Sequence, residues 1–75
     1  MKKNILITGA SGQLGQFFIE KLAENNNVIS TDINVSHELV KKYDLKFLDA
    51  LNETKVRKFI AVSYTHMTLT TIAEV

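Results

Sequence analysis

The chain has 75 residues, a net charge of +1, no cysteine, and lysines and arginines that are scattered rather than clustered. A chain of this length forms one small domain at most, and such a domain buries only about 60% of the surface that it exposes when unfolded. The missing cysteines exclude disulfides and thiolate metal sites, and nothing resembles the basic stripe of a nucleic-acid-binding protein. No apolar run is long enough to span a bilayer. We therefore expect a cytoplasmic protein with neither a nucleic-acid nor a membrane partner.

An apolar, β-branched segment at residues 4–8 predicts the first strand, and its continuous apolar character indicates burial on both faces of a parallel sheet. Leu14, Phe18 and Leu22 then recur at every fourth position. This spacing predicts a helix over residues 13–24, with Phe18 in the core.

The rest of the chain continues to alternate between strand and helix. A second β-branched run at residues 28–31 ends at Asp32, weak helical spacing follows over residues 36–43, and residues 46–49 are a third candidate strand. Asn52 suits the N-cap of a third helix. Alternation of this kind favours right-handed crossovers and a parallel sheet. We expect an α/β fold with a three-stranded parallel sheet in the order 3-2-1, which is one half of a doubly wound fold.

The three glycines of the chain stand at the turn from the first strand into the first helix, in the spacing Gly9-x-x-Gly12-x-x-Gly15. Gly9 is expected to let the chain turn sharply out of the strand. Gly12 has no side chain that would keep a pyrophosphate from the backbone, and Gly15 is expected to let the helix pack closely on the sheet. The pattern predicts a loop that binds phosphate groups.

Main-chain N–H groups near Gln13 and Leu14 are expected to bind the pyrophosphate, with help from the helix dipole. Ser11 is interpreted as a loop serine that bonds a phosphate or a backbone group, because the Gly-x-Ser-x-Gly motif of a nucleophile is not present. His37 and His66 lie far apart in the sequence, so we expect no metal site.

Asp32 ends the second strand 17 residues after Gly15, close to the spacing of about 20 residues that is typical of a ribose-binding acid. A carboxylate there accepts hydrogen bonds from both hydroxyls of the adenosine ribose and repels a 2′-phosphate. It therefore favours NAD over NADP as the cofactor. The alternative interpretation of Asp32 is an ordinary turn residue that closes a strand.

The strings "ITGASGQLG" and "VISTDI" resemble the N-terminus of an extended short-chain dehydrogenase/reductase, from the NAD-dependent epimerase/dehydratase superfamily. The resemblance covers residues 4 to about 60 and implies the N-terminal part of a Rossmann domain. It implies that Ile33 joins Asp32 at the ribose, and that Asp49 and Ala50 lie at the adenine. The predicted cofactor-binding residues are Gly9, Ser11, Gly12, Gln13, Leu14, Gly15, Asp32, Ile33, Asp49 and Ala50.

Catalysis in this family uses a serine or threonine and a Tyr-x-x-x-Lys pair. Phe47 is four residues after Tyr43, and Thr68 is four residues after Tyr64, so neither tyrosine forms the pair. We therefore predict no catalytic residue in this chain. The resemblance implies a homodimeric parent enzyme that is a sugar-nucleotide epimerase, dehydratase or reductase, or resembles L-threonine dehydrogenase.

Two alternatives to an enzyme fragment stay open. One is a non-catalytic module that binds or senses NAD(H), and the other is an α/β domain whose loop binds any anion or none. A parent chain that carries Tyr-x-x-x-Lys would favour the enzyme. If this chain binds NAD, we expect the binding to be weak, because the nicotinamide half of the site is missing from the sequence.

We expect residues 1–61 to be the N-terminal part of an NAD(P)-binding domain and residues 62–75 to be a divergent or artefactual tail. The tail lacks the family's pattern for a fourth strand and resembles a peptide that arises when a sequencing adapter is translated. The alternative is a genuine divergent strand, because the tail has high β propensity. Without a fourth strand, the outer edge of the first strand would be unpaired and apolar, so we expect the chain to self-associate.

Overall fold

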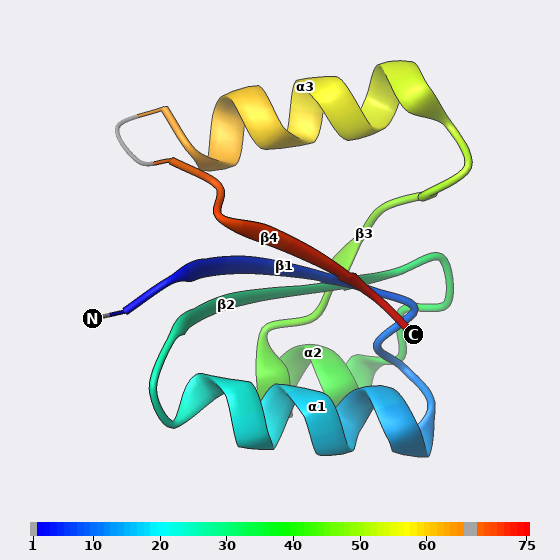
Figure 1. The fold of residues 1–75 in the computed structure, drawn as a ribbon. Coiled ribbons are helices and arrows are strands. Elements are labelled where there is room, and N and C mark those ends of the chain that lie inside the picture. Colours follow the sequence, from blue (N-terminus) through cyan, green and yellow to red (C-terminus); the bar gives the residue numbers. More distant parts are fainter. Residues whose placement is uncertain (1, 66–67) are drawn as a thin grey trace.

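The computed structural model describes residues 2–65 and 68–75. Strands and helices alternate along the chain, as the sequence predicts (Figure 1). The elements are β1 (Asn4–Thr8), α1 (Gln13–Ala23), β2 (Asn27–Asp32), α2 (His37–Tyr43), β3 (Lys46–Phe47), α3 (Glu53–Ser63) and β4 (Thr71–Glu74). The strands form one parallel sheet in the order β3-β2-β1-β4.

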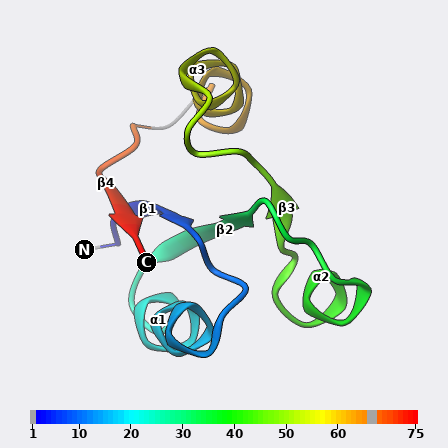
Figure 2. The same ribbon diagram turned by 90° about the vertical axis from the view of Figure 1, so that its right-hand side faces the viewer.

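The helices lie on both faces of this sheet. Figure 2 shows α1 and α2 on one face and α3 on the other. In the register of the two central strands, Ile5 lies beside Val28 and Ile7 beside Ser30. Because all the strands run in the same direction, the turns that follow β1, β2 and β3 meet at one end of the sheet. The predicted α/β fold with a parallel sheet is confirmed.

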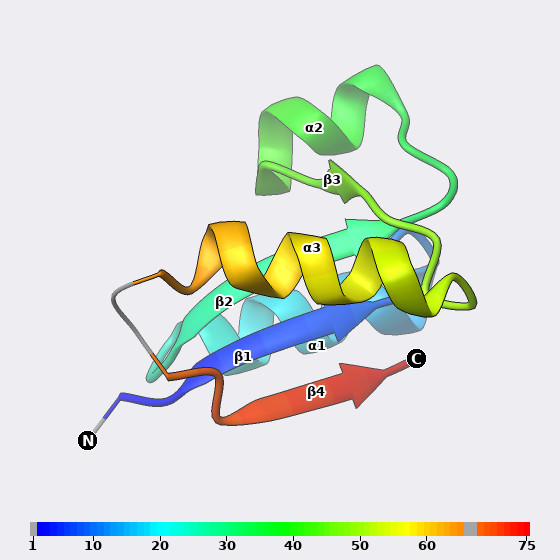
Figure 3. The ribbon, with the colours of Figure 1, turned by 90° about the horizontal axis from the view of Figure 1, so that it is seen from above.

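The prediction of three strands is wrong, because β4 pairs in parallel with the outer edge of β1 (Figure 3). The ladder runs from Ile5 beside Thr71 to Thr8 beside Glu74. The side-chain Nδ2 of Asn4 donates to the main-chain oxygen of Thr68 at 2.9 Å, which fastens the segment that leads into β4. The edge of β1 that we expected to be exposed is therefore covered. This pairing depends on backbone geometry and β propensity, so it leaves both hypotheses about the origin of the tail in place.

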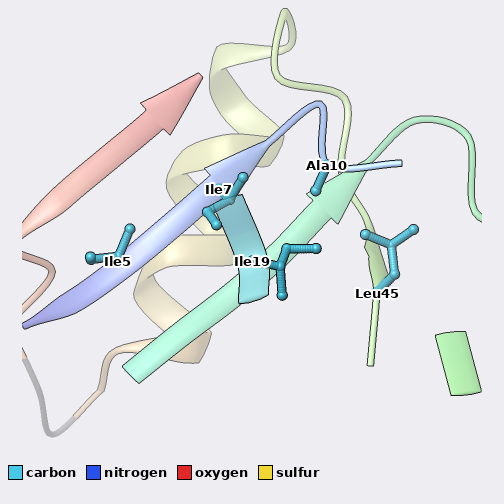
Figure 4. Packing of buried hydrophobic residues seen from close by; sticks show 5 residues of the cluster. All are labelled: Ile5, Ile7, Ala10, Ile19 and Leu45. Carbon is cyan, nitrogen blue, oxygen red and sulfur yellow. The ribbon is translucent and has the colours of Figure 1, made fainter. Parts of the chain in front are cut away.

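A cluster of buried apolar side chains fills the space between the sheet and the helices α1 and α2. Figure 4 shows its five buried members. They are Ile5, Ile7, Ala10, Ile19 and Leu45. Leu6 is fully buried too. Because successive side chains of a strand point to opposite faces, β1 is buried on both faces of the sheet, as its apolar run predicts.

The predicted core position of Phe18 in α1 is wrong, and Leu14 is likewise not buried. Phe18 is 38% exposed and Leu14 is 60% exposed, whereas Gly15 and Ile19 are buried. The reason is the close approach of Gly15 to the loop before the helix, which turns the Gly15–Ile19 side of α1 toward the sheet. Leu14 and Phe18 do lie on one side of α1, but this side is at the margin of the contact between the helix and the sheet.

The helix α3 packs less completely than α1. None of its residues is buried, and Phe59 and Ile60 are half-buried. Tyr64 follows α3 and is 8% exposed, and burial raises the pKa of its phenol. Its hydroxyl has no hydrogen-bond partner within the described residues. In those same residues, no helix combines the length and apolar character that a membrane crossing requires.

Candidate functional site

Gly9 makes the sharp turn at the end of β1. Its φ is +70°, in the left-handed region that side chains other than glycine rarely adopt. A Cβ at this position would lie 2.7 Å from the main-chain oxygen of Val75, which follows β4. Gly9 is therefore required both by its own backbone conformation and by the chain that passes beside it, as the sequence predicts for the turn.

Gly15 allows the closest approach of α1 to the rest of the molecule. A Cβ on Gly15 would lie 2.6 Å from the Cα of Ala10. The sequence predicts that this glycine lets the helix pack on the sheet, but the contact is with the backbone of the loop between β1 and α1. Gly15 therefore holds the helix against its own N-terminal loop.

Gly12 is the N-cap of α1, and the space above it is open. Its φ of −76° and ψ of 172° suit any residue, and no protein atom comes within 4 Å of the position that a Cβ would take. The main-chain N–H groups of Gly12, Gln13 and Leu14 have no acceptor in the described part of the chain. No acidic side chain lies in the first turn. This helix end therefore offers free donors and the positive end of the helix dipole to an anion.

The carboxylate of Asp32 lies beneath this loop and is 8% exposed. Its Oδ2 accepts a hydrogen bond from the main-chain N–H of Ser11 at 2.8 Å, and its Oδ1 accepts one from Asn34 at 2.9 Å. Burial alone would raise the pKa of Asp32, but the hydrogen bonds from Asn34 and Ser11 outweigh it and hold this pKa below its usual value. Asp32 is therefore charged at neutral pH.

Other main-chain hydrogen bonds join the ends of the three strands β1, β2 and β3. The N–H of Ala10 donates to the oxygen of Thr31 at 3.0 Å, and the N–H of Leu48 donates to the oxygen of Asp32 at 3.1 Å. The hydroxyl of Thr31, which is fully buried, donates to the oxygen of Ile7 at 2.7 Å. The loops that carry the predicted site residues are therefore tied to one another.

A cleft of about 180 Å³ opens at this end of the sheet. Five of the ten predicted cofactor-binding residues line it, together with two leucines that the sequence reasoning missed. The lining residues are Gly9, Asp32, Ile33, Asp49 and Ala50, with Leu48 and Leu51. The side chain of Asp49 accepts a hydrogen bond from the N–H of Leu51 at 3.0 Å, which shapes the turn before α3.

The other five predicted residues do not line the cleft. Gly12, Gln13 and Leu14 are exposed at the start of α1, and Ser11 contributes its N–H to Asp32. Gly15 is buried against the loop. Two signals could have indicated the missed leucines. Leu48 lies inside the predicted third strand, directly before Asp49. Leu51 is an apolar residue in the turn before α3, and it is 96% exposed.

A larger groove of about 380 Å³ lies between β3 and α3. Its lining is mostly apolar, with two lysines at the side of α3. The residues are Phe47, Leu48, Asp49, Lys55, Lys58, Phe59 and Val62. Leu48 and Asp49 line both this groove and the cleft. None of the other predicted site residues belongs to the groove.

The sequence also raises two other kinds of site, a metal site and a catalytic tyrosine. Within residues 2–65 and 68–75, no group of three or more histidine, aspartate or glutamate side chains is placed to share a metal ion. His66 lies outside the described residues. Neither Tyr43 nor Tyr64 lines the cleft beside the glycine loop.

Comparisons with family models, with curated proteins and with solved structures find no match to this chain. The glycine loop, Asp32 and the cleft are therefore the features of this chain that bear on its function.

The two glycines of α1 are expected to respond differently to alanine. In Gly15→Ala the new Cβ collides with Ala10, and overpacking of this kind costs about 1–3 kcal/mol. In Gly12→Ala the space is open, and we expect a small change in stability. Alanine is a poorer N-cap than glycine, which lowers stability, but it also reduces the entropy of the unfolded chain, which raises stability. Thermal unfolding followed by circular dichroism measures both. An equal loss of stability in the two variants would contradict this assignment.

Proposed function

We propose that this chain is the NAD-binding N-terminal part of an oxidoreductase of the extended short-chain dehydrogenase/reductase type. The observation that carries the proposal is the position of the charged Asp32 carboxylate directly beneath the glycine loop, at the end of the parallel sheet where the cleft opens. In open α/β sheets, ligands bind in the crevice beyond the carboxyl ends of the strands.

The free N–H groups of Gly12, Gln13 and Leu14 are suited to a pyrophosphate, which would approach over the open side of Gly12. The carboxylate of Asp32 uses one acceptor position on each oxygen for the main chain. An ionised carboxylate has about four such positions, and the Ser11 hydroxyl and the Ile33 N–H also hydrogen-bond it, so the two hydroxyls of a ribose would compete with these groups.

The charge of Asp32 favours NAD over NADP. A 2′-phosphate would lie against this carboxylate, and no lysine or arginine lines the cleft to compensate for the repulsion. At about 180 Å³ the cleft is smaller than the roughly 300–1,000 Å³ of typical small-molecule pockets, so it would enclose only part of a dinucleotide. We therefore expect weak binding, with the adenine next to Asp49 and Ala50.

A bound NAD supplies hydride transfer, and the residues of this chain would bind and orient its adenosine half. The Tyr-x-x-x-Lys pair of the family does not occur in the 75 residues. A cytoplasmic, homodimeric parent enzyme that carries this pair is part of the proposal. The alternative is a non-catalytic module that binds or senses NAD(H), and a parent chain without Tyr-x-x-x-Lys would favour it.

Titration calorimetry with NAD, NADP and inorganic phosphate tests this site. We expect NAD to bind more tightly than NADP, and Gly12→Ala to weaken NAD binding while the melting temperature stays close to that of the wild type. Asp32→Ala is expected to lower the affinity for NAD about tenfold or more, because hydrogen bonds to a charged group contribute about 1.5–3 kcal/mol. Equal affinities for NAD and inorganic phosphate would instead indicate a general anion site.

We also propose that the chain self-associates through the outer edge of β4. The other edge of the sheet is β3, which has two residues and carries Lys46, and a charged side chain there opposes pairing with another strand. β4 has four residues, and no described strand pairs with its outer edge. An antiparallel copy that places Thr71 opposite Glu74 brings no like charges together.

Sedimentation velocity at increasing protein concentration tests this association. Four-residue strands bury little surface, so we expect a weak dimer whose formation depends on concentration. Ile72 is 46% exposed at the centre of β4, and Ile72→Lys is expected to abolish the dimer. Leu51→Lys introduces the same charge at an exposed loop leucine and serves as the control. A dimer that persists in Ile72→Lys would contradict the assignment to β4.

A further inference from the structure

The side chain that the proposed function assigns to a ribose is already engaged with the loop assigned to the pyrophosphate. Asp32 Oδ2 accepts the N–H of Ser11, the residue immediately before the open N-cap Gly12. Its Oδ1 accepts the N–H of Asn34, so both oxygens of the carboxylate are bonded to main chain on opposite sides. The carboxylate therefore connects the loop after β1 to the turn after β2.

We propose that Asp32 is a positioning residue for the glycine loop: its carboxylate anchors Ser11, and thereby holds the N–H groups of Gly12, Gln13 and Leu14 in an anion-binding arrangement before any ligand arrives. This inference rests on the proposed function for the identity of the ligand, but not for the anchor itself. One carboxylate then serves two adjacent parts of a dinucleotide, the ribose directly and the pyrophosphate through the loop.

Two other contacts define what the anchor adds. Ala10 is bonded to Thr31 and is buried, so the start of the loop is fixed without Asp32. Gln16 Nε2 donates to the oxygen of Ser11 at 3.0 Å, which is a contact between neighbouring turns of the same segment. The Ser11 N–H to Asp32 bond is the contact that ties the middle of the loop to a different strand.

The anchor requires a carboxylate rather than an amide. Asparagine has one oxygen acceptor and an NH₂ group that only donates, so in Asp32→Asn one of the two main-chain N–H groups would face another donor. Asp32 is 8% exposed and Ser11 is half-buried, so water only partly replaces the hydrogen bond that the Ser11 N–H loses. Asp44 is the matched control, because Asp44→Asn removes the same charge at the exposed C-cap of α2, where the left-handed conformation (φ +55°) also suits asparagine.

Amide hydrogen exchange in the ligand-free chain tests the anchor. With Leu6 as the reference for global unfolding, we expect the N–H of Ser11 to exchange at least about tenfold faster in Asp32→Asn than in the wild type. Asp44→Asn should leave the exchange of Ser11 unchanged. Unchanged exchange of Ser11 in Asp32→Asn would overturn the proposal, whether or not the chain binds NAD.

A measurement on the wild type covers the case in which Asp32→Asn fails to fold. Magnetisation transfer across the hydrogen bond, from the Ser11 amide nitrogen to the side-chain carboxyl carbon of Asp32, detects the anchor directly. Its absence would overturn the proposal.

The consequence for binding is tested with inorganic pyrophosphate, which has no ribose. If Asp32 acts only on the ribose, Asp32→Asn should bind pyrophosphate as the wild type does, and this result would overturn the proposal. The anchor predicts a several-fold loss of affinity in Asp32→Asn and none in Asp44→Asn. Loss of Ser11 protection in a chain that binds neither NAD nor pyrophosphate would support the anchor while contradicting the proposed function.

Discussion

The hydrogen bond from the Ser11 N–H to the Asp32 carboxylate determines how the ends of β1 and β2 are combined into a site. Parallel pairing brings these two strand ends together, and the bond from the Ala10 N–H to Thr31 fixes the start of the loop after β1, but neither contact holds Ser11. The charged carboxylate of Asp32 does, and its loss would leave the half-buried N–H of Ser11 without its acceptor. The open helix end at Gly12 and the cleft beside Asp49 lie on the two sides of this bond.

Most of the fold could be predicted from local signals in the sequence. The β-branched run of β1 has the predicted bounds, and Ser36 and Asn52 cap the two later helices by accepting main-chain N–H groups. These features depend on residues close together in the chain. The glycine roles could be predicted for the same reason, since the φ of Gly9 and the open N-cap at Gly12 are properties of one turn.

Features that depend on distant residues could not be predicted in the same way. The close approach of Gly15 to the backbone of Ala10 determines which side of α1 is buried. The spacing of Leu14 and Phe18 in the sequence does not indicate this approach. The pairing of β4 with β1 joins residues such as Leu6 and Ile72, far apart in sequence, and the tail has no family pattern that announces a strand. The sequence likewise indicated a ribose contact for Asp32 but not its contact with Ser11, which requires knowledge of how the two loops face each other.

We propose that one cleft and one helix end, joined by Asp32, bind the adenosine half of NAD. Chemical-shift mapping of the backbone amides during titration with NAD tests this proposal. We expect the changes to concentrate at Gly12–Leu14, Asp32–Ile33 and Asp49–Ala50. Changes confined to the groove around Phe47, Lys58 and Phe59, or none at saturating NAD, would contradict it.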